Sequence, residues 1–295
     1  MLKQIKNVIK VFKPLLKKIS HDNIFAIAGQ SAFFLILSAV PLTMFAVSVM
    51  QNMHFPVETL ENLFKLVFNE EVTGYFSNYL SNVYQDATSI SIITLVITLW
   101  SAAQGIHAVT NGLNRVYGTY ENRNWLFLRL RAMIYTVVIF AILFSSMIVV
   151  VFGSFLNEQL SPYLLYLPDM VAVMFHLRYL IIFVYIVFLF SLLYRNFPNL
   201  SKDMRKEFGI SRQLPGAVFS AVAWFVLSFG ISIYVADFNG FSIYGGLTRL
   251  AVIMIWLYFC MVCLMIGAEI NYVYHDKIKT VTSYMGKRRK KNRRK

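Results

Sequence analysis

The chain has 295 residues, of which 58% are hydrophobic and only 14% are charged, and its formal net charge is +14 at pH 7. Soluble domains carry about a quarter charged residues, so this composition excludes an ordinary soluble enzyme and is typical of a polytopic membrane protein. The long apolar runs leave no stretch that would form a separate soluble domain.

Residues 1–23 combine six lysines with interleaved apolar residues. This pattern predicts an amphipathic helix that lies on the anionic inner surface of a membrane. A signal peptide is the alternative, but the apolar run that follows, Ile24 to Met50, is far longer than the hydrophobic region of a signal peptide. We therefore predict a retained first span over about residues 24–50, kinked at Pro41.

Residues 51–87 have the opposite charge balance, with several acidic side chains against the single Lys65. Apolar residues recur there at helical spacing, from Val72 to Val83, which predicts at least one amphipathic helix in an outer loop. Two roles are open for this region. It either caps a cavity or lies on the outer membrane surface.

Five further apolar runs are each long enough to cross a bilayer. In the last one, Leu250 to Ala268 contains no charged residue, and about 19 helical residues cover roughly 28 Å of hydrocarbon. A polybasic tail follows at residues 275–295. The predicted fold class is therefore all-α, a membrane domain over residues 24–274 with six transmembrane helices. The bounds predicted for the second to sixth spans are about 88–110, 132–156, 174–195, 215–236 and 247–268.

The positions of lysine and arginine predict the orientation of the six spans. If the amino terminus is inside, only Lys65, Arg178 and Arg249 of the 28 basic residues fall in outer segments. Both termini are then cytoplasmic. Their basic segments would contact anionic lipid of the inner leaflet, which is more common beside membrane spans than binding of nucleic acid.

Polar side chains form a stripe at steps of three and four along the end of the second span. Such residues usually join helices or line a wet cavity and seldom face lipid, so as a group they are a candidate pathway lining, although His107 alone would be a packing residue. Arg115 follows the stripe and is a candidate contact for an anionic headgroup, or an interfacial anchor. The stripe consists of Ser101, Gln104, His107, Asn111 and Asn114.

Glu269 ends the last apolar run and joins the stripe as a candidate lining residue. A carboxylate at this depth is costly unless it faces protein or water. The alternative is an interfacial glutamate that pairs with a lysine or arginine. Small residues near the start of the fifth span and along the sixth are predicted to permit close helix packing. These are Gly216, Ser220, Gly245, Gly246 and Gly267.

No catalytic residue, metal site or cofactor is predicted. Cys260 and Cys263 form a single CxxC inside the last span, where two small packing residues are the simplest interpretation. The five histidines include no pair at metal-ligand spacing, and no P-loop is present, which excludes a self-contained ATP motor of that type.

Several segments, in order along nearly the whole chain, resemble the YihY/virulence factor BrkB family of bacterial inner-membrane proteins, formerly labelled the ribonuclease BN family. The resemblance implies a six-span helical fold in the bacterial plasma membrane. The segments are SAFFLILSAVPL (31–42), WSAAQGIHAVTNGLNRVYG (100–118), YRNFPN (194–199), LPGAVFSAVAWF (214–225), YGGL (244–247) and LYFCMVCLMIGAEIN (257–271).

Three functions follow for consideration. The favoured one is a translocator of a lipid or another anionic amphiphile, which uses the polar stripe and Glu269. The alternative is a non-transporting scaffold, an assembly factor or an envelope-integrity factor that binds a partner through residues 51–87. A ribonuclease, which the older family label implies, is disfavoured because no clustered carboxylates or histidines are available to activate water, and Glu70 and Glu71 would diverge on a helix.

Overall fold

The computed structural model describes residues 13–52, 77, 92–160, 168–237 and 246–275. Within these ranges the regular structure is helical and contains no strand. The all-α prediction is confirmed to that extent. The predicted outer region 51–87 falls almost entirely outside the described residues, as do Gly245 and the polybasic tail.

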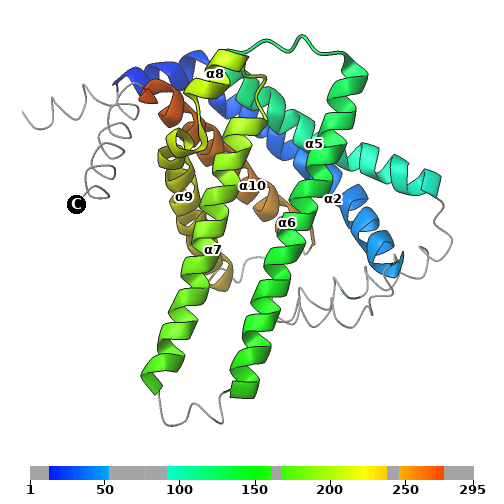
Figure 1. The fold of residues 1–295 in the computed structure, drawn as a ribbon, viewed down its shortest axis with the longest axis vertical. Coiled ribbons are helices and arrows are strands. Elements are labelled where there is room, and N and C mark those ends of the chain that lie inside the picture. The colour runs from blue at the N-terminus through cyan, green and yellow to red at the C-terminus, as the bar shows by residue number, and fades with distance from the viewer. Residues whose placement is uncertain (1–12, 53–76, 78–91, 161–167, 238–245, 276–295) are drawn as a thin grey trace, which may run out of the picture. The chain divides into compact units, whose positions relative to one another are not determined.

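In the described part of the chain, six helices have 25 residues or more (Figure 1). Each coincides with one of the six predicted apolar runs, because a long apolar run in hydrocarbon satisfies its backbone hydrogen bonds by forming a helix. They are α2 (Ile24–Asn52), α5 (Ile92–Val116), α6 (Trp125–Leu160), α7 (Pro168–Asn196), α9 (Ile210–Asp237) and α10 (Gly246–Val273).

Four helical stretches in the described chain are long and apolar enough to cross a membrane. They are Ile24–Phe45, Trp125–Ile142, Ile210–Tyr234 and Leu250–Val273. Ile182–Asn196 is a shorter apolar stretch within α7. The protein is therefore a helical membrane protein, and six spans remain a prediction.

Some helix bounds differ from the prediction. Helix α6 begins at Trp125, seven residues before the predicted third span, because the sequence WLFLRLR continues the helical apolar pattern through its two arginines. Helix α9 begins at Ile210, so Pro215 lies inside it instead of opening it. A short helix, α8 (Lys202–Glu207), was not predicted, and the Ser201 hydroxyl caps it by accepting from Met204 N.

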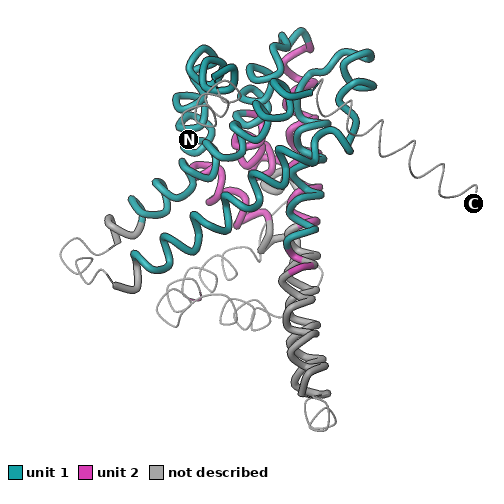
Figure 2. The backbone as a smooth tube through the Cα atoms, turned by 90° about the vertical axis from the view of Figure 1, so that its left-hand side faces the viewer, with its two compact units in different colours: residues 1–34, 108–122, 183–295 teal, residues 35–107, 123–182 magenta. Residues whose placement is uncertain are grey.

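The chain divides into two compact units, which Figure 2 colours separately. Unit 1 contains residues 1–34, 108–122 and 183–295. Unit 2 contains residues 35–107 and 123–182. Helices α2, α5 and α7 each contribute to both units, whereas α9 and α10 belong wholly to unit 1.

Helices α9 and α10 pack against each other in the core of unit 1 (Figure 1). Their closest approach is at two of the predicted packing glycines. A Cβ at Gly216 would overlap with the carbonyl oxygen of Gly267, and a Cβ at Gly267 would overlap with the Ser220 hydroxyl. Only glycine permits this backbone contact.

Candidate functional site

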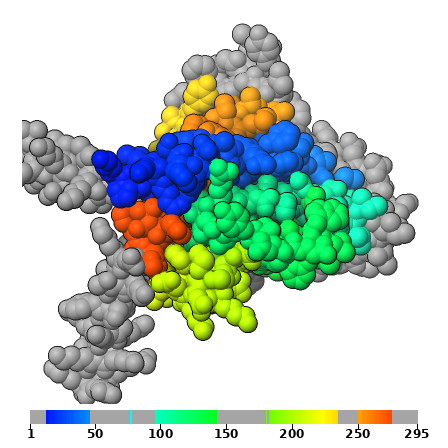
Figure 3. All heavy atoms as spheres, turned by 90° about the horizontal axis from the view of Figure 1, so that it is seen from above, coloured from blue at the N-terminus to red at the C-terminus, as the bar shows by residue number. Residues whose placement is uncertain are grey.

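A buried cluster of charged side chains lies where the N-terminal helical segment, residues 13–21, meets the end of α10. Glu269 is fully buried, and Lys18 Nζ lies 3.2 Å from its Oε2 atom. Figure 3 shows the dark blue N-terminal segment against the red-orange end of α10. Glu269 is therefore buried and paired with a lysine from the other end of the chain, which combines the two interpretations that the sequence left open.

Lys18 is held by three acceptors. Its ammonium group donates to the Asp22 carboxylate, to the Val116 carbonyl oxygen at 2.9 Å and, at 3.5 Å, to Glu269 Oε1. It also lies 4.5 Å above the centre of the Tyr272 ring, a cation–π distance. Because an ammonium group has three N–H donors, these three acceptors match all of them.

Asp22 places a second carboxyl group beside the same lysine. It is 7% exposed, and its Oδ1 atom lies 2.7 Å from Nδ1 of the exposed His21. The Asp22 carboxyl and the Glu269 carboxyl both contact the Lys18 ammonium group. We name Lys18, Asp22 and Glu269 the charged cluster. It brings two carboxyl groups to one ammonium group, so the cluster has more acidic groups than basic groups.

The pKa of Asp22 follows from these contacts. Burial raises the pKa, but the hydrogen bonds from Lys18 and His21 outweigh burial and lower it below the ordinary value of 3.8. A carboxyl whose pKa is lower in the folded state stabilises the fold above its ordinary pKa, and this stabilisation is lost as the pH falls through the folded value.

We expect Asp22→Asn to lower the midpoint of thermal unfolding in detergent at pH 7, where it removes a charge-assisted hydrogen bond of about 2 kcal/mol. The difference between wild type and variant should shrink as the pH falls from about 4 through the lowered pKa of folded Asp22, because Asp22 then becomes protonated in both states. Thermal melts between pH 7 and pH 3 measure this. A difference that is constant over the range, or that grows on acidification, contradicts the account.

A second polar network joins Tyr117, the residue after α5, to α9 and α10. Gln213 Oε1 accepts from the Tyr117 hydroxyl at 2.7 Å and from Asn271 Nδ2 at 2.9 Å. Asn271 Oδ1 in turn accepts from Gly216 N at 2.7 Å. All three side chains are buried. A buried network of this kind fixes the angle and register of the helices that carry it.

The predicted polar stripe on α5 is not one continuous buried surface. Ser101 and Asn111 are exposed, Gln104 and His107 are half-buried, and Asn114 is buried. Small residues form the buried side of the helix instead, since a Cβ at Gly112 would meet Ile27 and Met265, and one at Gly105 would meet Ser38. The sequence spacing identified a common helical face but not its surroundings.

Asn114 has a local architectural role. Its Oδ1 atom accepts from Asn199 N at 2.6 Å and from Thr119 Oγ1 at 3.1 Å, and its Nδ2 atom donates to Glu121 at 3.1 Å. One side chain therefore ties the loop after α5 to the loop after α7. These hydrogen bonds link loops, and none of them is to Glu269.

The remaining predicted residues lie as follows. Arg115 is exposed in the last turn of α5. Pro41 is half-buried and α2 continues through it. Ser220 is buried, and its hydroxyl contacts the Tyr194 hydroxyl at 2.7 Å and donates to the Cys263 carbonyl at 2.9 Å. Gly246 is the first residue of α10.

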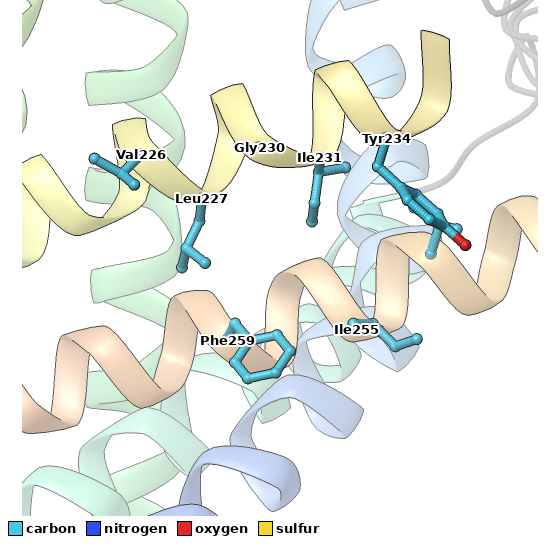
Figure 4. A pocket seen from close by; sticks show the side chains of 8 residues that line it. Val226, Leu227, Gly230, Ile231, Tyr234, Ile255 and Phe259 are labelled. Carbon is cyan, nitrogen blue, oxygen red and sulfur yellow. The ribbon is translucent and has the colours of Figure 1, made fainter. Parts of the chain in front are cut away.

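An apolar groove lies between α9 and α10, farther along the pair from the charged cluster (Figure 4). Its volume is about 400 Å³, and a tyrosine hydroxyl is the only polar side-chain group on its walls. In Figure 4, Leu227 and Ile231 of α9 point toward Phe259 and Ile255 of α10. The other lining residues are Val226, Gly230, Tyr234 and Val252.

The sequence reasoning missed Lys18, Asp22, Gln213 and Asn271 as site residues. One signal was available, because Asp22 is the only acidic residue before Glu58 and lies four residues after Lys18, a helical ion-pair spacing. Gln213 and Asn271 lie at the ends of apolar runs, where an amide side chain that becomes buried needs hydrogen-bond partners. Their partners lie far away in the sequence, which is why spacing alone did not identify the site.

The helices and the buried charged cluster define a polytopic helical membrane protein with an ionisable core. Residues 15–292 match the family model described as virulence factor BrkB. The chain belongs to this family, so the resemblance noted from the sequence is confirmed.

Known relatives cover most of the chain. YfkH of Bacillus subtilis, described as a putative ribonuclease-like protein, is 26% identical over 270 residues, which is 85% of this chain and 90% of that protein. A UPF0761 membrane protein of Alteromonas mediterranea is 25% identical and covers 90% of this chain and 87% of its own length. Another from Tolumonas auensis is 26% identical, with 86% and 81% covered. No solved structure matches the chain significantly.

Proposed function

We propose that this protein is a translocator of a lipid or another anionic amphiphile in the bacterial plasma membrane, and not an enzyme. The proposal includes six spans with both termini in the cytoplasm. The near-absence of basic residues from the predicted outer segments supports this orientation.

The observation that carries the proposal is the charged cluster. Glu269 lies inside the apolar stretch Leu250–Val273 and is fully buried, and Lys18 is the ammonium group that pairs with it. Ionisable groups in membrane spans are costly and are typical of substrate or ion pathways. A lysine shared by two carboxyl groups is suited to exchange one of these groups for an anionic headgroup.

Helix α10 also supplies the apolar half that an amphiphile requires. Phe259, at the groove, and Glu269, in the charged cluster, are ten residues apart, about 15 Å along the helix axis. A hydrocarbon chain in the groove would thus contact α10 near Phe259, and a headgroup near Lys18 would contact the same helix near Glu269. This arrangement favours an amphiphile over a small inorganic ion.

The test uses purified protein reconstituted in liposomes that contain lipids labelled on one leaflet with a fluorophore. Phosphatidylglycerol and phosphatidylcholine serve as the anionic and zwitterionic probes, and protein-free vesicles give the background. We expect faster transbilayer movement of the anionic probe in the proteoliposomes. Equal rates with and without folded protein for both probes would reject the proposal and favour the scaffold.

A further inference from the structure

The guanidinium group of Arg129 carries an uncompensated charge in unit 2. Arg129 lies in the second turn of α6, inside the apolar stretch Trp125–Ile142. Its Nε and Nη1 atoms are buried and have no hydrogen-bond partner, and no carboxylate in the described part of the chain pairs with it. A desolvated cation without hydrogen bonds is costly, so in the membrane this group needs an anion.

Trp100 contacts this arginine, and Trp125 packs against Trp100. The guanidinium carbon lies 5.5 Å from the centre of the Trp100 ring, within the range of a cation–π contact. The Trp100 and Trp125 rings meet edge to face at 5.6 Å. Tryptophans gather at the level of the lipid headgroups, and Arg129 is four residues from the helix start, or about 6 Å below it. Arg129, near the start of α6, is therefore expected close to headgroup depth.

Part of the α6 surface beside Arg129 is open. Leu126 and Leu130, which neighbour Arg129 around the helix, are about half exposed, at 50% and 49%. Apolar side chains exposed on a membrane-spanning helix face lipid. A long arginine side chain on this face can present its charged end to a headgroup while its methylene groups stay in hydrocarbon.

We propose that Arg129, with Trp100 and Trp125, forms a binding site for a phosphate group. The ligand is a phosphodiester of an anionic lipid, and free inorganic phosphate is the other source of the same chemistry. A guanidinium group is suited to this role because its planar N–H donors match phosphate oxygens. The site is distinct from the charged cluster, and binding there does not require that the protein transports lipid.

Arg131 provides a matched control two residues along the same helix. Its Nε atom donates to the Tyr135 hydroxyl at 2.9 Å, and its guanidinium group lies 5.0 Å from that ring. Arg129 and Arg131 carry the same charge at nearly the same depth. They differ in that Arg131 has a hydrogen-bond partner within its own helix. A general electrostatic attraction of anions would depend on both arginines. Binding at the proposed site would depend on Arg129 alone.

The experiment measures quenching of tryptophan fluorescence by brominated lipids in reconstituted protein, because two of the four tryptophans belong to the site. The binding constant of brominated phosphatidylglycerol is taken relative to that of brominated phosphatidylcholine. We expect Arg129→Gln to lower this ratio about tenfold, as for loss of a charge-assisted hydrogen bond, and Arg131→Gln to leave it within about twofold. Arg129→Lys keeps the positive charge but lacks the planar N–H donors of the guanidinium group, so it should give an intermediate ratio. If Arg129→Gln fails to fold, Arg129→Lys provides the test.

Inorganic phosphate, added to protein in phosphatidylcholine vesicles that contain brominated phosphatidylglycerol, distinguishes the two sources. If anionic lipid displaces brominated phosphatidylglycerol and inorganic phosphate does not, the result supports a lipid site. Quenching relieved by millimolar phosphate in wild type, but not in Arg129→Gln, supports the phosphate site with a soluble ligand. An unchanged ratio in folded Arg129→Gln and Arg129→Lys, or an equal loss in Arg131→Gln, overturns the proposal.

Discussion

Lys18→Met is expected to lower the free energy of unfolding by about 3–5 kcal/mol, the cost of leaving a buried charge without its partner. The substitution removes the ammonium group from the charged cluster and leaves the buried carboxyl groups of Asp22 and Glu269 without their shared partner. Glu269→Gln should cost less, because Lys18 keeps the Asp22 carboxylate and the Val116 carbonyl as acceptors. Thermal and denaturant unfolding in detergent measure both effects.

The double variant isolates the interaction between the two residues. We expect Lys18→Met/Glu269→Gln to be more stable than the sum of the single changes predicts, with a coupling energy of about 1 kcal/mol or more. Lys17→Met is the control, because the neighbouring Lys17 is exposed and should tolerate the change. Additive single effects, or a Lys17→Met variant as unstable as Lys18→Met, would argue against the buried pair.

Gly267→Ala is expected to destabilise the protein by about 3 kcal/mol, which corresponds to a fall of roughly 10 °C in the unfolding midpoint. The added Cβ would overlap with the Ser220 hydroxyl and lie 2.5 Å from the Tyr194 hydroxyl. Tyr194 donates to the Leu264 carbonyl at 2.8 Å, so its displacement would also break a buried hydrogen bond. A thermal melt in detergent checks the prediction.

Gly230→Ala is the matched control for this substitution. Gly230 lies in the partner helix, α9, and a Cβ there would meet no atom within 4 Å. Alanine has the higher helix propensity, so this variant should be unchanged or more stable by up to about 1 kcal/mol. If Gly267→Ala unfolds at the same temperature as Gly230→Ala, the close approach of α9 and α10 at Gly267 is wrong.

The helices could be predicted from the sequence because each depends on a local property. An apolar run long enough to cross a bilayer identifies its own helix, so all six long helices coincide with predicted spans. Their ends were less certain. The start of α9 lies five residues before Pro215 and that of α6 lies before Arg129 and Arg131, so neither a proline nor charged residues marked the boundary.

The candidate site could be predicted only in part, because its contacts join distant segments. Glu269 was identified from its position in an apolar run, and the glycine contacts from small residues at helical spacing. Lys18, however, belongs to a basic segment whose pattern suggested a lipid surface, and it contacts a residue 251 positions away. Asn114 shows the converse, since its helical face was clear but its partners lie in loops that periodicity does not describe.

The most direct test of the account is the rate of transbilayer movement of labelled phosphatidylglycerol in liposomes with wild type, Glu269→Gln or no protein. Glutamine keeps the shape of the side chain and removes its ability to ionise. We predict movement in wild-type vesicles that falls at least tenfold toward the protein-free rate in Glu269→Gln, with the variant still folded by thermal melt. Equal rates for wild type and Glu269→Gln, both above background, would contradict a role for the charged cluster in translocation.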